Sequence, residues 1–173
     1  MESQTEQGKG VEVNVDDRKA RIKFILMDVD GTLTDGRIYC GPSGEVMKVF
    51  HAQDSSGFAL AREHHIGIGW GSGKASTIAR NRATALGIQC YYDGVKHKDE
   101  GVKEIAKRFR LELSEICFIG DDTNDIPAMQ ICGLSIAVCN AVHAVKDLAN
   151  YVTASKGGEG AVREAIEWLV GGW

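Results

Sequence analysis

Short apolar runs alternate with amphipathic segments along most of this chain. Runs such as 24–27 (Phe-Ile-Leu-Met) and 116–119 (Ile-Cys-Phe-Ile) are typical of strands buried on both faces of a sheet. The segments between them have the spacing of helices that bury one face. Strand and helix alternation of this kind indicates βαβ units. We therefore expect an α/β fold with a Rossmann-like, doubly wound parallel sheet between two layers of helices.

The same pattern assigns elements to most of the sequence. We expect strands over 22–28, 66–71, 87–91, 116–120, 134–138 and 150–153. We expect helices over 54–65, 74–86, 97–110, 124–132, 141–148 and 159–170. Residues 1–20 are polar without sustained periodicity and are predicted to form a flexible leader, which leaves 21–173 as one folded domain.

One segment interrupts the alternation early in the chain. Residues 37–39 and 46–50 flank Gly41-Pro42-Ser43-Gly44, and this composition is typical of a turn. We expect a β-hairpin over about 37–50. Because it follows an acidic motif at a predicted strand end, it should stand beside the mouth of any site there.

Composition and charge exclude several classes of protein. The net charge is −4, and the 20 lysines and arginines are scattered, which argues against a nucleic-acid partner. No apolar run is long enough to predict a membrane span, and no hydrophobic signal core begins the chain. The five cysteines show no Cys-x-x-Cys spacing, so we expect reduced thiols, with Cys117 and Cys139 buried, in a cytoplasmic protein.

The first candidate site is the pair of carboxylates Asp28 and Asp30. They follow the apolar run at 24–27, at the carboxyl end of a predicted strand, where open α/β sheets bind ligands. Strand alternation sends both side chains to the same side. Their repulsion is unfavourable unless a cation or a shared proton relieves it. The pair therefore predicts a site.

A second acidic cluster, Gly120-Asp121-Asp122-Thr123-Asn124-Asp125, follows the strand at 116–120. Two strand ends with carboxylates can converge at one edge of a parallel sheet, and several oxygen ligands there suit Mg²⁺. An ordinary alternative is that Asn124 or Asp125 caps the next helix. The two clusters together favour a magnesium site.

These motifs resemble those of the haloacid dehalogenase superfamily of phosphohydrolases, over about 22–169. The first motif of that superfamily, Asp-x-Asp-x-Thr, matches residues 28–32. The Ser or Thr that ends a strand matches Ser72, the motif lysine matches Lys98, and Gly-Asp-Asp-x-x-Asp matches residues 120–125. Each motif is weak alone, but their order and their positions at strand ends or helix starts make the match specific.

The resemblance implies a role for each residue. Asp28 would attack phosphorus and become an aspartyl phosphate, while Asp30 would protonate the leaving oxygen and later activate water. Ser72 would donate a hydrogen bond to the phosphoryl group, and Lys98 would balance its charge. As alternatives, Ser72 could cap the next helix and Lys98 could be a solvated residue at a helix start.

The resemblance also implies a ligand set for Mg²⁺. Asp28, the backbone carbonyl of Asp30, and Asp121 would bind the ion together with the substrate phosphate. Asp122 and Asp125 would orient metal-bound water or Lys98. The glycine-rich segment 157–160 lacks any nucleotide-binding motif, so we interpret it as a turn before the last helix.

The short hairpin narrows the resemblance to an uncapped, tetrameric subfamily that includes 3-deoxy-D-manno-octulosonate 8-phosphate phosphatases. Further similarities are residues 35–39 at the hairpin entry, 81–88, and 157–164. In that subfamily the hairpins assemble a homotetramer, and residues of an adjacent subunit help to wall the site. The same assembly is expected here, with a small sugar-acid phosphate as the substrate.

Three positions depart from the octulosonate phosphatase pattern, which usually has arginines there. This chain has Gln53, Lys74 and Ala59 instead. An arginine fork binds a carboxylate differently from a lysine ammonium or a neutral glutamine. We therefore expect a 2-keto-3-deoxy sugar-acid phosphate, and leave open whether it is an eight-carbon 8-phosphate or a nine-carbon, sialic-acid-type 9-phosphate.

Five residues are candidates for binding the sugar acid: Asp54, Ser55, Ser56, Lys74 and Arg82. The segment 54–57 (Asp-Ser-Ser-Gly) is similar to that of phosphatases acting on nine-carbon sugar acids. Ser55 and Ser56 could bind sugar hydroxyls or could belong to an ordinary helix N-terminus. Arg82 could bind the substrate carboxylate or make a subunit contact.

Two other classes of protein use some of these features. A domain of animal sialic-acid cytidylyltransferases is related but catalytically silent, and chiefly drives tetramerisation; its acidic motifs are degraded, whereas they are intact here. Response-regulator receivers also form an aspartyl phosphate, but on a later strand, after an acidic pair on the first. The motif at 28–32 and the late acidic cluster disfavour a receiver.

Overall fold

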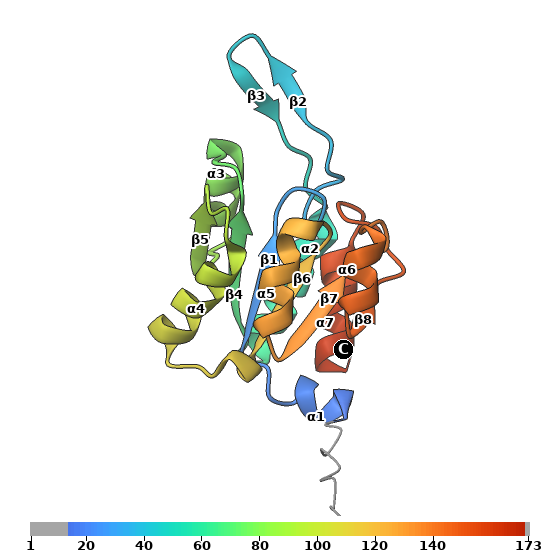
Figure 1. Ribbon diagram of the computed structural model, residues 1–173. Helices are drawn as coiled ribbons and strands as arrows, with labels where there is room; N and C mark the ends of the chain where they lie inside the picture. Colours follow the sequence, from blue (N-terminus) through green and yellow to red (C-terminus); the bar gives the residue numbers. More distant parts are fainter. Residues whose placement is uncertain (1–13, 172–173) are drawn as a thin grey trace, which may run out of the picture.

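The computed structural model describes residues 14–171 and consists of a central sheet between two helical layers (Figure 1). The strands of the main sheet are β1 (Phe24–Asp28), β4 (Gly67–Ser72), β5 (Cys90–Asp93), β6 (Ile116–Gly120), β7 (Leu134–Ala137) and β8 (Tyr151–Val152). They are parallel and lie in the order β5-β4-β1-β6-β7-β8. This confirms the predicted Rossmann-like α/β fold.

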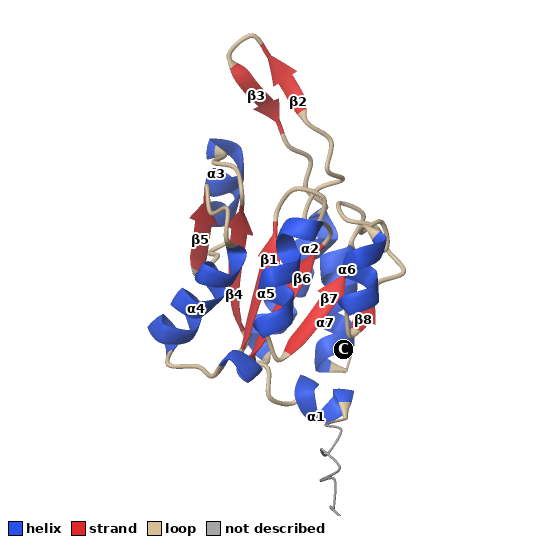
Figure 2. Ribbon diagram, viewed as in Figure 1, coloured by secondary structure: helices blue, strands red, loops and turns tan. Residues whose placement is uncertain are grey.

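Helices cover both faces of this sheet, as the blue ribbons of Figure 2 show. They are α2 (Ala52–Glu63), α3 (Thr77–Ala85), α4 (Lys98–Phe109), α5 (Ile126–Ile131), α6 (His143–Leu148) and α7 (Ala161–Val170), while α1 (Val15–Lys19) lies below the sheet in the same view. Helix α2 packs against α7, whereas α5 packs against α4 and α6 on the other face. Short 3₁₀ helices at Leu113–Glu115 and Thr123–Asp125 flank β6.

The central strands are buried on both faces because helices cover both. Every residue of β1 and β6 is buried, which explains their unbroken apolar runs. Trp70, Phe24 and Phe118 are among the largest fully buried side chains, and burying a side chain of this class contributes about 1.5–3 kcal/mol. The carboxyl edge of the sheet is thereby held on a rigid core.

The predicted hairpin consists of β2 (Tyr39–Gly41) and β3 (Gly44–Met47), which pair antiparallel. It extends from the carboxyl edge of the main sheet, at the top of Figure 1, away from the helical layers. Among the described residues it is the one sheet insertion between β1 and α2, and no cap domain accompanies it. No helix in the described part of the chain is long and apolar enough to cross a membrane.

Several boundaries differ from those predicted, for local reasons. Helix α3 begins at Thr77 instead of 74, because the Ser76 hydroxyl accepts a hydrogen bond from the Ala79 amide and caps the helix there. Helix α7 begins at Ala161 because Gly160 has a φ of 92°, outside the helical region. Strand β5 runs over 90–93 instead of 87–91, since it pairs with β4 only from Cys90 onward.

The predicted leader also differs in part from the structure. Residues 1–13 lie outside the described residues. Val15–Lys19 form helix α1, in which the Lys19 ammonium lies 4.7 Å from the ring centre of Trp168 on α7. All five cysteines are free; Cys117 is buried as expected, whereas Cys139 is only half-buried.

Candidate active site

Three neighbouring strands bring the predicted catalytic residues together at one edge of the sheet. Asp28 pairs with Gly71 in the register of β1 with β4, and Met27 pairs with Ile119 in the register of β1 with β6. Asp28 and Ser72 are the last residues of β1 and β4, and Asp121 directly follows β6, so the three lie at nearly the same level. The sequence predicted that these strand ends meet. The fold thereby brings together segments that are far apart in the sequence.

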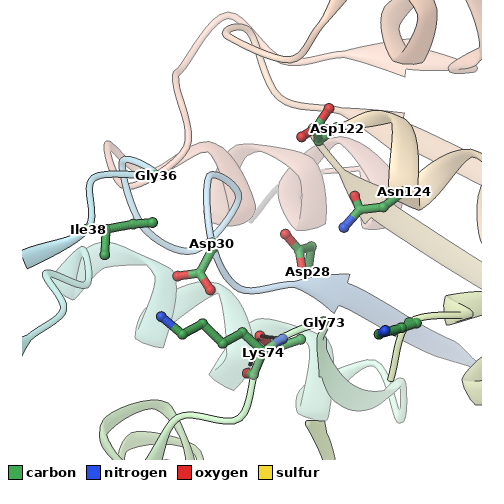
Figure 3. Close-up of a pocket in the computed structure, with 10 residues that line it drawn as sticks. Asp28, Asp30, Gly36, Ile38, Gly73, Lys74, Asp122 and Asn124 are labelled. Atoms are coloured by element: carbon green, nitrogen blue, oxygen red, sulfur yellow. Dashed lines mark hydrogen bonds between the residues drawn. The ribbon is translucent and has the colours of Figure 1, made fainter. Parts of the chain in front are cut away.

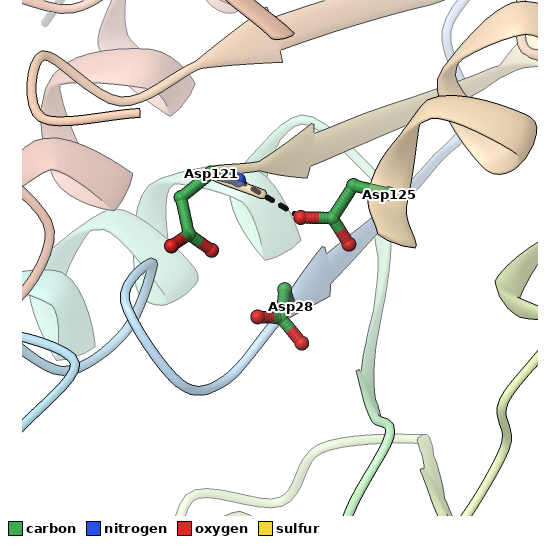
Figure 4. Close-up of side chains that lie close together, drawn as sticks. All are labelled: Asp28, Asp121 and Asp125. Atoms are coloured by element: carbon green, nitrogen blue, oxygen red, sulfur yellow. Dashed lines mark hydrogen bonds between the residues drawn. The ribbon is translucent and has the colours of Figure 1, made fainter. Parts of the chain in front are cut away.

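The centre of the site is a carboxylate cluster formed by Asp28, Asp121 and Asp125 (Figure 4). One oxygen of each lies within 4.8 Å of the others. The Lys98 ammonium, only 3% exposed, lies 2.6 Å from Asp28 Oδ1 and 2.5 Å from Asp125 Oδ1. One ammonium cannot balance three carboxylates, so the cluster retains negative charge that a cation would offset.

Burial shifts the ionisation of these acids. It raises the pKa of Asp28 well above its usual range, while Lys98 opposes the shift and Asp125 adds to it. Burial also raises the pKa of Asp121 to about 6, and the charge on Asp125 contributes. Buried carboxylates whose charge is this unfavourable fit a site for a hard divalent cation such as Mg²⁺.

Asp125 organises the loop that carries the second acidic motif. Its Oδ2 accepts hydrogen bonds from the backbone amides of Asp121 and Asp122, at 2.9 and 3.1 Å, while its Oδ1 pairs with Lys98. It occupies the N-cap position of α5, yet its side chain makes no capping bond to that helix. The two oxygens of Asp125 thus bond Lys98 and the loop, and its role in orienting Lys98 stays a prediction.

Asp122 lies at the exposed rim, where its side chain accepts a 2.7 Å hydrogen bond from the Thr123 amide. No contact between Asp122 and Lys98 occurs in the described structure, so of its two implied roles only that toward metal-bound water is retained as a prediction. Ser72 is not a helix cap: its hydroxyl bonds the backbone of Lys74, and Ser76 caps α3 instead.

Glycines allow the loop after β1 to approach its neighbours. Gly31 has a φ of 95°, and a Cβ there would overlap the Asp121 carboxylate. The Thr32 hydroxyl donates to Asp121 Oδ1 at 3.2 Å. On the other side of the loop, a Cβ on Gly157 would overlap the carbonyl oxygen of Gly31. The turn at 157–160 therefore also packs behind the first motif, a role the sequence reading missed.

An open cleft of about 440 Å³ lies over this edge (Figure 3). Its walls include four residues predicted to act on substrate, namely Asp28, Asp30, Ser72 and Lys74. It is also lined by Asp122, a predicted site residue, and by five residues that were not predicted: Gly36, Ile38, Gly73, Lys96 and Asn124. Two features of the sequence could have pointed to these residues. Lys96 is close to the motif lysine, Lys98, and Gly36 and Ile38 lie at the entry to the hairpin.

The Asp30 side chain turns away from the carboxylate cluster toward the base of the hairpin. Its Oδ1 forms an ion pair with Lys48, which also lies 2.7 Å from Glu45. Burial acts to lower the pKa of Lys48, but its bonds to Asp30 and Glu45 outweigh burial and raise that pKa. The backbone carbonyl of Asp30 stays the predicted ligand for a cation beside Asp28. The sequence reading did not single out Lys48, which lies among apolar hairpin residues.

The remaining predicted sugar-binding residues do not line the cleft in a single chain. Asp54, Ser55 and Arg82 instead lie around a separate small pocket beneath α2 and α3, where Arg82 donates to the Ser55 hydroxyl at 3.3 Å. Ser56 is half-exposed on α2 and belongs to neither set of lining residues. Of the five predicted sugar-binding residues, the structure brings only Lys74 to the cleft.

Asp54 is a buried acid of α2, and one of its two carboxylate oxygens is hydrogen-bonded. Its Oδ1 accepts from the Arg163 amide at 3.0 Å, whereas its Oδ2 has no hydrogen-bond partner among the described residues. Burial raises its pKa to about 6, with the Arg163 amide and His51 opposing. This arrangement ties α2 to α7.

Comparison with known proteins agrees with this geometry. A family model described as haloacid dehalogenase-like hydrolase matches residues 87–166. The chain is 36% identical over 149 residues to 3-deoxy-D-manno-octulosonate 8-phosphate phosphatase KdsC of Haemophilus influenzae, covering 86% of this chain and 83% of that protein.

Two solved structures have the same fold over nearly their whole length. The cobalt-bound octulosonate phosphatase of H. influenzae matches with a TM-score of 0.86 and 34% identity, covering 89% of this chain and 90% of that one. The Moraxella catarrhalis enzyme in complex with magnesium, phosphate and 3-deoxy-D-manno-octulosonate (KDO) also has a TM-score of 0.86, with 33% identity and 90% coverage of both chains. The chain therefore belongs to the haloacid dehalogenase-like hydrolases, as its four motifs predicted.

Proposed function

We propose that this protein is a Mg²⁺-dependent phosphomonoester hydrolase that acts on a 2-keto-3-deoxy sugar-acid phosphate. The observation that carries the proposal is the buried cluster at the carboxyl edge of the sheet. There Asp28 contacts Lys98, lies beside Asp121, and opens onto a cleft that Asp30 and Ser72 also line. The activities named for the similar phosphatases support the same reaction.

The proposed reaction has two displacements at phosphorus. An oxygen of Asp28 attacks, the bond from phosphorus to the sugar oxygen breaks, and that oxygen takes a proton from Asp30. Water then attacks the aspartyl phosphate and gives a proton back to Asp30, which releases phosphate and restores Asp28. Ser72 donates to a phosphoryl oxygen, and Lys98 offsets negative charge on Asp28 and the phosphoryl group.

Asp28, Asp121 and the backbone carbonyl of Asp30 would hold the Mg²⁺ ion. When bound, the ion supplies positive charge that stabilises the phosphoryl group during transfer. Both oxygens of Asp125 are already bonded, Oδ1 to Lys98 and Oδ2 to the Asp121 and Asp122 amides, so we assign Asp125 to orienting the lysine instead of to the ion. Asp122, at the rim, would contact metal-bound water.

The favoured substrate is KDO 8-phosphate, because the similar proteins named above act on it or bind KDO. The departures at Gln53, Lys74 and Ala59 keep a nine-carbon 9-phosphate as the second candidate. Lys74 lines the cleft, and we assign it to the substrate carboxylate.

We further propose that a homotetramer completes the site. Four apolar side chains of the hairpin region are exposed, with Ile38 at 65% and Val46 at 56%, followed by Val49 and Met47. An exposed apolar group on a projecting hairpin suits a second copy of this chain. Residues such as Arg82 could then reach the cleft of a neighbouring subunit. The free cysteines fit a reducing cytoplasm.

A phosphate-release panel tests the proposal. The purified enzyme with Mg²⁺ is assayed on KDO 8-phosphate, on 9-phosphates of sialic-type acids, and on hexose phosphates. We expect turnover of a sugar-acid phosphate that is lost with chelator and with Asp28→Asn, but kept in the exposed control Asp147→Asn. A preference for hexose phosphates would refute the substrate class. An intact tetramer without turnover on any phosphate would favour the silent assembly domain.

A further inference from the structure

Lys48 occupies an unusual position for a lysine on an exposed hairpin. It directly follows β3, yet its side chain is only 4% exposed, while apolar neighbours such as Val46 and Val49 face solvent. Lysine is seldom buried unless it is paired. Its two partners are Asp30, from the first motif, and Glu45, from its own hairpin.

The pairing forms a continuous polar chain from a helix cap to the site. Ser76, which caps α3, donates to Glu45 Oε2 at 2.5 Å, and Glu45 Oε1 lies 2.7 Å from the Lys48 ammonium. Lys48 in turn bonds Oδ1 of Asp30. The base of the hairpin is therefore fixed both to α3 and to the loop that carries the proposed acid and base.

This contact distinguishes the two oxygens of Asp30. Oδ1 is bonded to Lys48, whereas Oδ2 has no hydrogen-bond partner among the described residues, and the side chain lines the cleft with 34% exposure. A carboxyl group that exchanges a proton with substrate must present one oxygen in a fixed direction. An ammonium on the other oxygen fixes that direction.

We propose that Lys48 is a positioning residue for Asp30, held in place by Glu45 and Ser76, and that the hairpin is thereby part of the catalytic machinery. The inference rests on the proposed function. In the first step Oδ2 gives its proton to the leaving sugar oxygen, and Lys48 remains beside the carboxylate that forms. In the second step the attacking water returns a proton to Oδ2. No other reactant is needed.

Direct substrate binding by Lys48 is the main competing role. The lysine could reach a substrate anion only by leaving two carboxylates in a site where its ammonium is almost fully buried. Lys74, by contrast, is exposed and lines the cleft, so a cation for the substrate is already present. The geometry therefore favours a contact with Asp30 alone.

Leaving groups of different acidity test the proposal. An alkoxide must be protonated as it leaves a sugar phosphate, whereas p-nitrophenolate leaves without a proton. We expect Lys48→Met to slow the single-turnover phosphorylation of Asp28 by the sugar-acid phosphate about 10²-fold or more, with KM changed less than about threefold. Its phosphorylation by p-nitrophenyl phosphate should change less than about fivefold.

The second step gives an independent signature. Hydrolysis of the aspartyl phosphate needs Asp30 as a base whatever the substrate, so Lys48→Met should release one equivalent of p-nitrophenolate in a burst and then turn over slowly. Lys48→Arg should recover part of the loss, since it keeps the charge. Arg37→Met, an exposed cation at the hairpin entry, should behave as the wild type.

Two results would overturn the proposal. Equal slowing of phosphorylation by both substrates would indicate a structural role alone, and a raised KM with unchanged kcat would indicate substrate binding. If Lys48→Met does not fold, as judged by circular dichroism, Glu45→Gln replaces it and should give the same leaving-group dependence in weaker form. A wild-type enzyme inactive on both phosphates would refute the proposed function itself.

Discussion

The carboxylate cluster and the hairpin differ in their exposure and in the kind of side chains they present. Asp28, at the end of the central strand β1, and Lys98, at the start of α4, are nearly fully buried, whereas Ile38 and Val46 are exposed on the hairpin. The cluster must hold like charges in fixed positions, which requires a rigid and poorly solvated surrounding. The hairpin instead presents apolar surface that only a partner would cover. Buried polar contacts thus fix the proposed catalytic groups, both in the cluster and at the hairpin base where Lys48 meets Asp30. The exposed apolar side chains of the same hairpin are left for the proposed partner.

The largest effect is expected from a variant that moves a carboxylate of the cluster without removing its charge. In Gly31→Ala the new methyl group would displace the Asp121 carboxylate. We expect kcat/KM to fall about 10²-fold or more and Mg²⁺ affinity to fall about tenfold or more, because the proposed ligand is moved. Steady-state assays against Mg²⁺ concentration measure both.

Gly44→Ala is the matched control for that variant. Gly44 has a φ of 111°, but a Cβ there would meet no atom within 4 Å. Both variants carry backbone strain, of about 1–2 kcal/mol, and only one touches a carboxylate. Similar losses of activity in the two would contradict the assigned role of the Gly31 and Asp121 contact.

A second prediction concerns Asp54, a buried acid outside the cluster. Its folded-state pKa of about 6 lies above the ordinary value of 3.8, so its contribution to stability is full below about pH 4 and is lost as pH rises through 6. Asp54→Asn should therefore unfold with the same free energy as wild type near pH 4. Near pH 7.5 it should be more stable, by at most about 3 kcal/mol.

Urea unfolding of Asp54→Asn and wild type across that range gives the difference directly, free of the other acids that both chains share. The exposed Asp147→Asn serves as the control and should show no pH-dependent difference. A variant less stable than wild type at pH 7.5 would mean that the ionised Asp54 is satisfied by a partner, such as a second subunit.

The smallest effect on the folded chain is expected at the hairpin. Val46→Lys replaces an exposed side chain and should change the free energy of unfolding of a single chain by less than about 0.5 kcal/mol. If the hairpins form the tetramer, the same change should dissociate it, as light scattering would measure. Val152→Lys, at the exposed β8 edge, should leave assembly intact. If neither variant dissociates the tetramer, the hairpin is not part of the subunit interface.

The sequence predicted the fold well because strand ends and helix starts depend on local patterns. Asp28 and Ser72 each end a strand, Asp121 directly follows one, and parallel pairing brings the three to one edge. Lys48 could not be found this way, since its contact with Asp30 depends on the path by which the hairpin returns to the sheet. That path is set by long-range contacts, which periodicity does not record.

The predicted sugar-binding group shows the same limit. Asp54, Ser55 and Arg82 do lie near one another, but in a single chain they face a different pocket from the cleft. Family patterns identify such positions, but they do not show whether the side chains belong to the site of their own chain or to that of a neighbouring subunit. Similarly, the turn containing Gly157 was assigned to the correct segment, while its contact with Gly31, far away in sequence, required the structure.

The central claim is that Asp28 carries the phosphoryl group. The most direct test is acid quenching of the enzyme during turnover of KDO 8-phosphate with Mg²⁺, followed by mass spectrometry of the peptide that contains residues 24–34. We predict one phosphoryl group on Asp28, absent from the Asp28→Asn variant and released by hydroxylamine. Phosphate release from the substrate without a phosphoryl group on Asp28 at any time, or with one on another residue, would contradict the account.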